Sequence, residues 1–179
     1  IFSWSPSSVL MDYYERALYN HILASQNPEN GMMCYFVPLR MGTKKQFSDS
    51  FNTFTCCVGS GVENHSKYAE QIYSQDAGNT LFVNLFIPSA LNWKEKGIML
   101  RQETAFPDNN NTTLTFQQAK AAKLNIRIRK PSWNAVMPVV FVNGKKVLTE
   151  ADGTGYYSIA GVFKKGDSIR VEFDMQVYA

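Results

Sequence analysis

The sequence predicts a mixed α and β fold, in which a helical part is followed by an antiparallel β-sandwich. Up to about residue 76, apolar residues recur every three to four positions, which is typical of a helix that faces a core. From Asn79 onward, apolar and polar residues alternate instead, and turn signals separate about seven short runs. We therefore expect a helical domain over residues 1–76 and a β-sandwich domain over residues 77–179.

Two helices are predicted in the first part. Apolar residues with four-residue spacing follow Ser8, namely Leu10, Tyr14, Leu18 and Ile22. Asp12 lies near the start of this helix, where its dipole favours a negative charge, and Asn27-Pro28 ends it. A short apolar stretch, Met32 to Leu39, and a long loop over residues 40–55 separate it from a second helix expected from about Gly61 to Ser74.

The second part reads as strands joined by turns. From Leu124 to Arg129 apolar and basic residues alternate, as on a strand with one face in the core and one in solvent. Ser168 to Phe173 alternates in the same way, whereas Thr80 to Ile87 is more continuously apolar and is expected to be buried on both faces. Asn143-Gly144 and Lys165-Gly166-Asp167 are predicted hairpin turns.

Composition excludes several classes of protein. The formal net charge is +3 and the basic residues are dispersed, so no nucleic-acid partner is expected. No apolar run approaches the roughly 18 residues that cross a bilayer, so no membrane partner is expected either. The chain begins with Ile1 rather than Met, and we interpret this start as a processed or truncated end.

The cysteines carry the strongest chemical signal. Three cysteines do not form a disulfide framework, but Cys56 and Cys57 are adjacent and precede a glycine-rich turn and a helix start. A helix N-terminus favours the thiolate, which is both the nucleophilic and the metal-binding form. Metal ligation, catalysis and simple burial of two small side chains all stay open at this point.

Other candidates have simpler interpretations. A local zinc site that adds Glu63 and His65 to the cysteine pair is disfavoured, because the thiols and the imidazole lie on either side of the predicted helix start. His21 is interpreted as a core histidine on the apolar side of the first helix. Glu63 and Glu70 lie seven positions apart on one helix face and are interpreted as solvated charges rather than a glycosidase carboxylate pair.

Several segments, in order along the chain, resemble one group of enzymes. They are Asp12–Ala24, Tyr35–Leu39, Cys56–His65, Thr80–Ser89, Ile128–Trp133 and Val140–Gly144. Together they resemble glycoside hydrolase families 127 and 146, bacterial enzymes that remove β-L-arabinofuranose from plant glycans. The Cys-Cys-Val-Gly-Ser-Gly form is closer to family 146, which is common among gut Bacteroidetes.

The resemblance implies a catalytic (α/α)6 barrel, of which residues 1–76 are the C-terminal remnant, followed by the sandwich. It implies a Zn²⁺ ion held by a glutamate and three cysteines. Cys56 matches the nucleophile, which is also a zinc ligand, Cys57 matches a second ligand, and Tyr35 matches a substrate-binding tyrosine near the nucleophile. A thioglycosyl intermediate on the nucleophile would give retention of configuration.

The chain also departs from the family pattern. No glutamate stands two residues before any cysteine, so the element that supplies the other two ligands is absent, as is the acid/base glutamate. The full-length parent is therefore expected to be the glycosidase, whereas this fragment is expected to bind zinc weakly or not at all and to cleave no glycoside. Apolar side chains meant for missing helices would favour self-association.

An arabinofuranose-containing glycan is the implied partner, and a periplasmic or secreted bacterial location is the implied setting. One alternative is a non-catalytic carbohydrate-binding or structural β-sandwich module that uses exposed aromatics such as Trp93 or Trp133. Another is a thiol- or zinc-regulated protein that uses Cys56 and Cys57.

Overall fold

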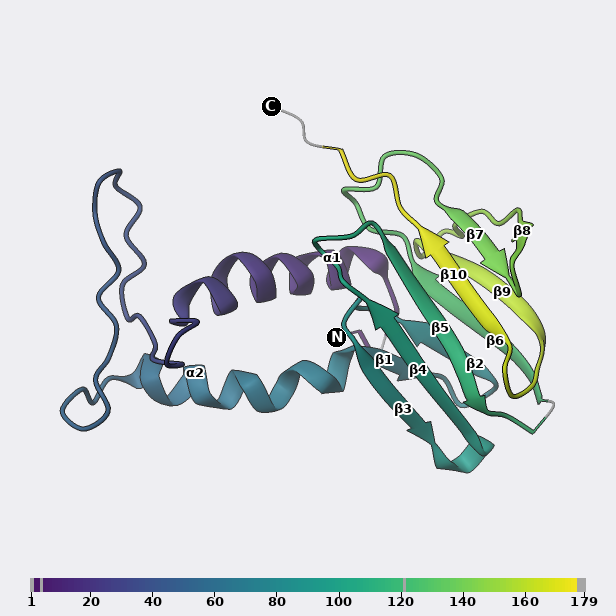
Figure 1. The fold of residues 1–179 in the computed structure, drawn as a ribbon, viewed down its shortest axis with the longest axis horizontal. Coiled ribbons are helices and arrows are strands. Elements are labelled where there is room, and N and C mark those ends of the chain that lie inside the picture. Colours follow the sequence, from purple (N-terminus) through teal and green to yellow (C-terminus); the bar gives the residue numbers. More distant parts are fainter. Residues whose placement is uncertain (1, 4, 121, 177–179) are drawn as a thin grey trace. The chain divides into compact units, whose positions relative to one another are not determined.

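A computed structural model describes residues 2–3, 5–120 and 122–176 (Figure 1). The chain divides into two compact units, one formed by Ile1–Asp12 with Gln71–Ala179 and the other by Tyr13–Glu70. The first helix, α1 (Ser8–Ala17), contributes residues to both units. Within the described residues, no helix combines the length and the apolar character that crossing a bilayer requires.

The helical unit contains the helices expected from the sequence, with different bounds. After α1 the chain continues through a π-helical turn η1 (Leu18–Ile22) and a 3-10 turn η2 (Leu23–Ser25), so the predicted first helix is confirmed. The second helix, α2 (Cys56–Lys67), starts at the cysteine pair and ends in a 3-10 turn η3 (Tyr68–Gln71). The prediction that it begins near Gly61 is wrong, because both glycines of this stretch lie inside the helix.

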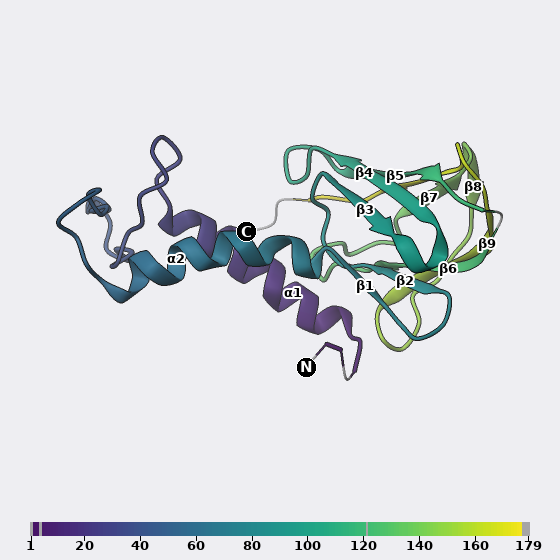
Figure 2. The ribbon, with the colours of Figure 1, turned by 90° about the horizontal axis from the view of Figure 1, so that it is seen from below.

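Ten strands are found among the described residues, and they form two sheets (Figures 1 and 2). The strands are β1 (Tyr73–Gln75), β2 (Thr80–Val83), β3 (Ser89–Trp93), β4 (Ile98–Thr104), β5 (Asn111–Gln118), β6 (Ala122–Arg129), β7 (Val139–Val142), β8 (Lys145–Val147), β9 (Tyr156–Phe163) and β10 (Ser168–Glu172). A 3-10 turn η4 (Lys94–Lys96) follows β3. One sheet has the strand order β1-β2-β6-β9 and the other the order β3-β4-β5-β10-β7-β8.

The two sheets enclose one apolar core, which confirms the predicted sandwich. Alternate residues of the strands point into it, as on β5, where every second side chain is buried. Neighbouring strands are antiparallel except for β2 and β6, which are parallel and in register from Thr80↔Asn125 to Val83↔Ile128. Because β2 is central in its sheet, its side chains Leu81, Phe82 and Val83 are all buried, as its continuous apolar run predicts.

The two predicted hairpin turns have different outcomes. Asn143 and Gly144 join β7 to β8 with φ values of 51° and 75°, the left-handed pair that a two-residue hairpin turn requires, so this prediction is confirmed. Lys165–Asp167 reverses the chain between β9 and β10, but these strands belong to different sheets. The prediction of a hairpin there is therefore wrong, because turn residues specify a reversal and not the strand that receives it.

A buried ion pair fastens the start of α1 to the sandwich. The guanidinium of Arg129 is paired with the carboxylate of Asp12, and the two side chains are 0% and 8% exposed. Arg129 Nε also donates to the carbonyl of Asn84 (2.6 Å), and the backbone N–H of Ser132 donates to Asp12 Oδ1 (3.2 Å). The expectations that Arg129 faces solvent and that Asp12 serves the helix dipole are both wrong.

The same end of α1 contacts a turn of the sandwich. The N–H of Ser8 donates to the carbonyl of Thr154 (2.9 Å). Gly155, next in the chain, has φ +80°, and a Cβ atom there would lie 2.0 Å from Ser8 Oγ. This position therefore needs glycine both for its left-handed backbone and for the close approach of the helix.

A hydrogen-bonded tyrosine connects the two sheets on one side of the sandwich. The hydroxyl of Tyr73 on β1 lies 3.0 Å from Ser89 Oγ at the start of β3 and donates to Gln102 Oε1 on β4 (3.0 Å). Burial raises the pKa of Tyr73 to about 12, from an ordinary value of 10.0. Below pH 10 the tyrosine is neutral in both the folded and the unfolded chain, so it costs no stability there.

We expect alkaline pH to remove stability through this tyrosine. As the pH rises from 10 to 12, the unfolded chain releases the Tyr73 proton first, which lowers the free energy of unfolding by about 2–3 kcal/mol. In Tyr73→Phe this loss disappears, so the stability difference between parent and variant narrows over that range in urea titrations. Tyr13→Phe, at an exposed tyrosine, is the control. If the difference in unfolding free energy between the parent and Tyr73→Phe stays constant from pH 9 to 12, the raised pKa of Tyr73 is contradicted.

Candidate active site

The cysteine pair occupies the first two positions of α2. Thr55, just before the helix, is extended with φ −115° and ψ 154°, and its hydroxyl makes no capping hydrogen bond. Figure 1 shows the long loop of the helical unit entering this end of α2. The chain turns from the extended Thr55 into the helix, so both thiols lie in its first turn, whereas the sequence predicts them just before it.

The structure brings the three predicted site residues together. Cys56 Sγ lies 4.0 Å from Cys57 Sγ, with Cys56 exposed and Cys57 half-buried. Tyr35 lines the same hollow as Cys57, and the charge of the Cys56 thiolate is the largest cause that raises the pKa of the tyrosine. A phenol and two thiols therefore share one solvent-accessible point.

The thiols influence one another as well as Tyr35. Removal from water is the largest cause that raises the pKa of Cys57, and a hydrogen bond with Cys56 and the charge of that thiol add to it. The sequence predicts the opposite direction, from the helix dipole alone. The surroundings of Cys57 therefore favour the protonated thiol over the thiolate.

The segment that carries Tyr35 is held by backbone hydrogen bonds. The N–H of Cys34 donates to the carbonyl of Ser25 (2.7 Å), and the N–H of Ser48 donates to the carbonyl of Met33 (2.9 Å). Cys34 is buried, and its thiol donates to the carbonyl of Phe36 (2.7 Å). Cys34 therefore has a structural partner on the far side of Tyr35 in the sequence, which keeps the tyrosine segment bent.

A close contact sets the distance between this segment and α2. Gly61 is buried, and a Cβ atom placed on it would lie 2.6 Å from both Cγ and Cε of Met33. The glycine therefore lets Met33 rest directly on the helix backbone. Gly59, two positions earlier in the same helix, has nothing within 4 Å. The sequence signal for this contact is a glycine inside a helix, which our prediction treats only as a helix breaker.

A hollow of about 500 Å³ opens next to the thiols. Its wall includes Tyr35, Phe36 and Cys57, together with the polar side chains of Asn20, His21 and Asn64. His21 is exposed on this wall, so the expectation that it is a core histidine is wrong. The mixture of aromatic and amide side chains can contact both the faces and the hydroxyls of a sugar.

The remaining candidates lie elsewhere. His65 is hydrogen-bonded to Gln26 (3.0 Å), and Glu63 and Glu70 are exposed, as predicted for solvated charges. Glu70 pairs with Lys67 (3.0 Å). Among the residues that the structure describes, no group of three or more His, Cys, Asp or Glu side chains is placed to hold one metal ion.

Of the tryptophans proposed as sugar platforms, Trp93 is buried in the sandwich core and Trp133 is half-buried against it, so neither is among the exposed side chains of the described residues. Trp93 is 5% exposed, and Trp133 stacks on Phe106 with ring centroids 5.4 Å apart.

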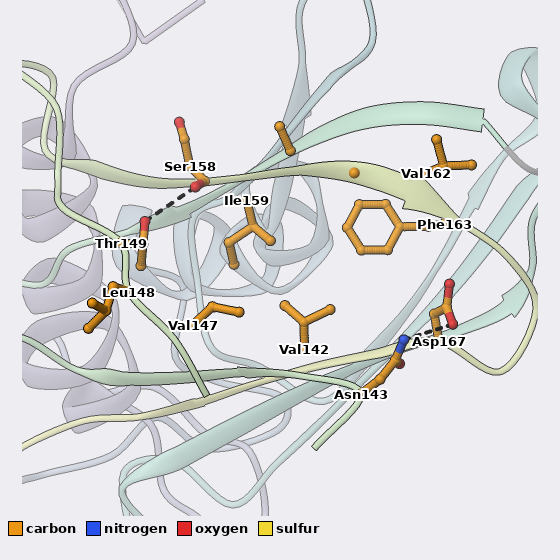
Figure 3. Close-up of a pocket in the computed structure, with 12 residues that line it drawn as sticks. Val142, Asn143, Val147, Leu148, Thr149, Ser158, Ile159, Val162, Phe163 and Asp167 are labelled. Carbon is orange, nitrogen blue, oxygen red and sulfur yellow. Dashed lines mark hydrogen bonds between the residues drawn. The ribbon is translucent and has the colours of Figure 1, made fainter. Parts of the chain in front are cut away.

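A second hollow, of about 320 Å³, lies between β8 and β9 (Figure 3). Its centre is apolar, and Asn143 donates to Asp167 at one end (3.0 Å).

Comparisons with known proteins identify the family of the chain. The β-L-arabinofuranosidase GH127 catalytic-domain family matches residues 1–70, and the GH127 middle-domain family matches residues 80–175. The chain belongs to glycoside hydrolase family 127. Among curated protein sequences, none matches it significantly.

Solved structures share the fold of this GH127 chain. It aligns with a GH127 β-L-arabinofuranosidase from Geobacillus stearothermophilus T6 at 23% identity and a TM-score of 0.83, covering 99% of this chain. A GH127 β-arabinofuranosidase gives 24% identity, a TM-score of 0.81 and 98% coverage, and a glycoside hydrolase gives 21%, 0.82 and 98%. The chain spans 30% of the length of each of these proteins.

Two glycines of α2 give a matched test of the packing that positions Tyr35. We expect Gly61→Ala to force Met33 out of its place and to destabilise the helical unit by about 1–3 kcal/mol relative to Gly59→Ala. Gly59→Ala removes a flexible residue from a helix and is expected to be neutral or to stabilise by up to about 1 kcal/mol. Urea titration followed by far-UV circular dichroism measures both. Equal effects of the two substitutions would disprove the contact.

Proposed function

We propose that this GH127 chain is part of a retaining β-L-arabinofuranosidase that acts on plant glycans with a zinc-bound cysteine nucleophile. Cys56 is the nucleophile and a zinc ligand, Cys57 is a second ligand, and Tyr35 contacts the sugar beside them. The observation that carries the proposal is the meeting of one phenol and two thiols at the start of α2. Membership of the family supports the hydrolysis of a glycosidic bond.

The spacing of the two sulfurs supports a shared metal ion. Two thiolates bound to tetrahedral zinc at about 2.3 Å lie about 3.8 Å apart. The 4.0 Å between Cys56 Sγ and Cys57 Sγ is close to that edge of a tetrahedron. The pair therefore fits two of the four ligand positions, and no third His, Cys, Asp or Glu side chain among the described residues is placed to complete the set.

The chemistry divides between the ion and the protein. Zinc, when bound, stabilises the thiolate form of both cysteines at neutral pH, which the metal-free site does not favour at Cys57. The sulfur of Cys56 then attacks the anomeric carbon of the sugar, a carbon–sulfur bond forms, and the bond to the departing alcohol breaks. Water later displaces the sulfur from the opposite face, so two inversions give retention.

The tyrosine has a distinct role in this scheme. The ordinary pKa of a tyrosine is 10.0 and the neighbouring thiolate charge raises that of Tyr35, so its phenol is protonated and can donate a hydrogen bond at neutral pH. A donor next to the nucleophile can hold a ring oxygen or a hydroxyl of the sugar. A proton donor for the departing alcohol must come from another part of the full protein. A periplasmic or secreted bacterial location suits an enzyme with such a substrate.

Three single substitutions in the full-length protein test these roles. We expect Cys56→Ser to lower hydrolysis of an aryl β-L-arabinofuranoside by a factor on the order of 10⁴ or more, because the nucleophile is lost. Cys57→Ser is expected to lower both activity and zinc content, measured by atomic emission. Cys34→Ser is the matched control, since the buried thiol of Cys34 donates a hydrogen bond to the carbonyl of Phe36. Full activity in Cys56→Ser, or equal zinc loss in Cys34→Ser, would refute the assignment.

The 179-residue chain gives a second test, because it supplies only half of a tetrahedral set. We expect equilibrium dialysis to give zinc binding far below one ion per chain at micromolar zinc, and no cleavage of the same glycoside. Stoichiometric zinc that survives dialysis would mean that the missing donors are not needed. The ligand set proposed here would then be wrong.

A further inference from the structure

The cysteine pair has a property that depends neither on zinc nor on glycoside chemistry. Cys56 and Cys57 are free thiols, one exposed and one half-buried, with sulfurs 4.0 Å apart. We propose that this pair is a capture site for monosubstituted trivalent arsenicals, which bind both sulfurs through one arsenic atom. The class of ligand follows from the spacing, from the access and from the number of donors.

The spacing favours a bridging atom over a direct sulfur–sulfur bond. A disulfide needs its sulfurs at about 2.05 Å, so the two thiols would have to approach each other by roughly half their present separation. An atom that binds sulfur at about 2.3 Å spans separations of up to about 4.6 Å. The 4.0 Å pair therefore accepts a bridging atom with little movement, whereas oxidation to a disulfide would distort the first turn of α2.

The number of donors selects the kind of bridging atom. Zinc seeks four ligands, and this pair supplies two. Arsenic in a monosubstituted trivalent arsenical keeps its bond to carbon and needs only two sulfurs, which are soft donors that suit a soft centre. One oxide R–As=O reacts with two thiols to form two As–S bonds, and both thiol protons leave with the oxygen as one water molecule. No electron is transferred in this condensation.

Access and surroundings favour an aryl substituent. The ring of Tyr35, beside the thiols, lies 4.5 Å from that of Phe36 in an edge-on arrangement, and the two residues are 44% and 80% exposed. A phenyl group on the arsenic can pack against these exposed rings. Cys34 differs from the pair in access and in neighbours. It is 4% exposed, its thiol is hydrogen-bonded to the carbonyl of Phe36, and it has no adjacent cysteine.

The test uses phenylarsine oxide with the 179-residue chain, a phosphine reductant and a metal chelator. Intact mass spectrometry is expected to give one adduct per chain with loss of one water. The adduct should protect Cys56 and Cys57, but not Cys34, from iodoacetamide added after unfolding. Cys56→Ser and Cys57→Ser should each weaken binding by about 100-fold or more, whereas Cys34→Ser should bind like the parent.

A comparison with the unfolded chain separates the folded site from mere adjacency in the sequence. The folded protein is expected to bind phenylarsine oxide at least about 10-fold more tightly than the chain in concentrated urea, because the helix start holds the sulfurs together. Equal affinity in the two states, or unchanged binding in either serine variant, would overturn the proposal. Since the chelator removes zinc throughout, such a failure would leave the proposed glycosidase function untouched.

Discussion

The ion pair between Asp12 and Arg129 is the constraint on which the rest of the fold depends. Taking two charges out of water is costly, and the structure offsets this cost with hydrogen bonds from the pair to the backbone of Asn84 and Ser132. Removing one partner of such a pair typically costs about 3–5 kcal/mol. The pair binds residue 12 of α1 to the end of β6, within the sandwich unit. The buried hydroxyl of Tyr156 donates to the side chain of Asn84 (2.8 Å), which extends the same polar network into the sandwich.

The helical unit holds the two thiols and the phenol of the candidate site near one another. The sulfurs of Cys56 and Cys57 lie 4.0 Å apart at the start of α2, although neighbouring side chains on a helix ordinarily diverge. Tyr35 arrives from a segment that is anchored on both sides and rests on the helix at Gly61. The site depends on the residues that hold it in place, because neighbouring groups set the pKa values of Tyr35 and Cys57.

Sequence patterns predict much of this molecule, and the failures have physical causes. Alternation identifies β6 and β10, and Asn143-Gly144 identifies a hairpin, because strand faces and left-handed turns impose local rules. Arg129 is an exception to the rule that the polar residues of an alternating strand face solvent. The sequence pattern does not reveal that α1 covers this face of the strand and carries the carboxylate of Asp12. The start of α2 is missed because Gly59 and Gly61 resemble a turn, whereas Gly61 serves close packing against Met33. Tyr35, Cys56 and Cys57 are found by resemblance, and only the folded chain brings them together.

The claim that Cys56 attacks the sugar is tested most directly by finding the bond it forms. The full-length protein would be mixed with a β-L-arabinofuranoside that carries a good leaving group, quenched in acid within milliseconds and mapped by peptide mass spectrometry. The account predicts one pentose on the peptide that contains residues 56 and 57, attached to the sulfur of Cys56 and absent in Cys56→Ala. A pentose attached to a carboxylate, or rapid turnover with no adduct at any quench time, would contradict it.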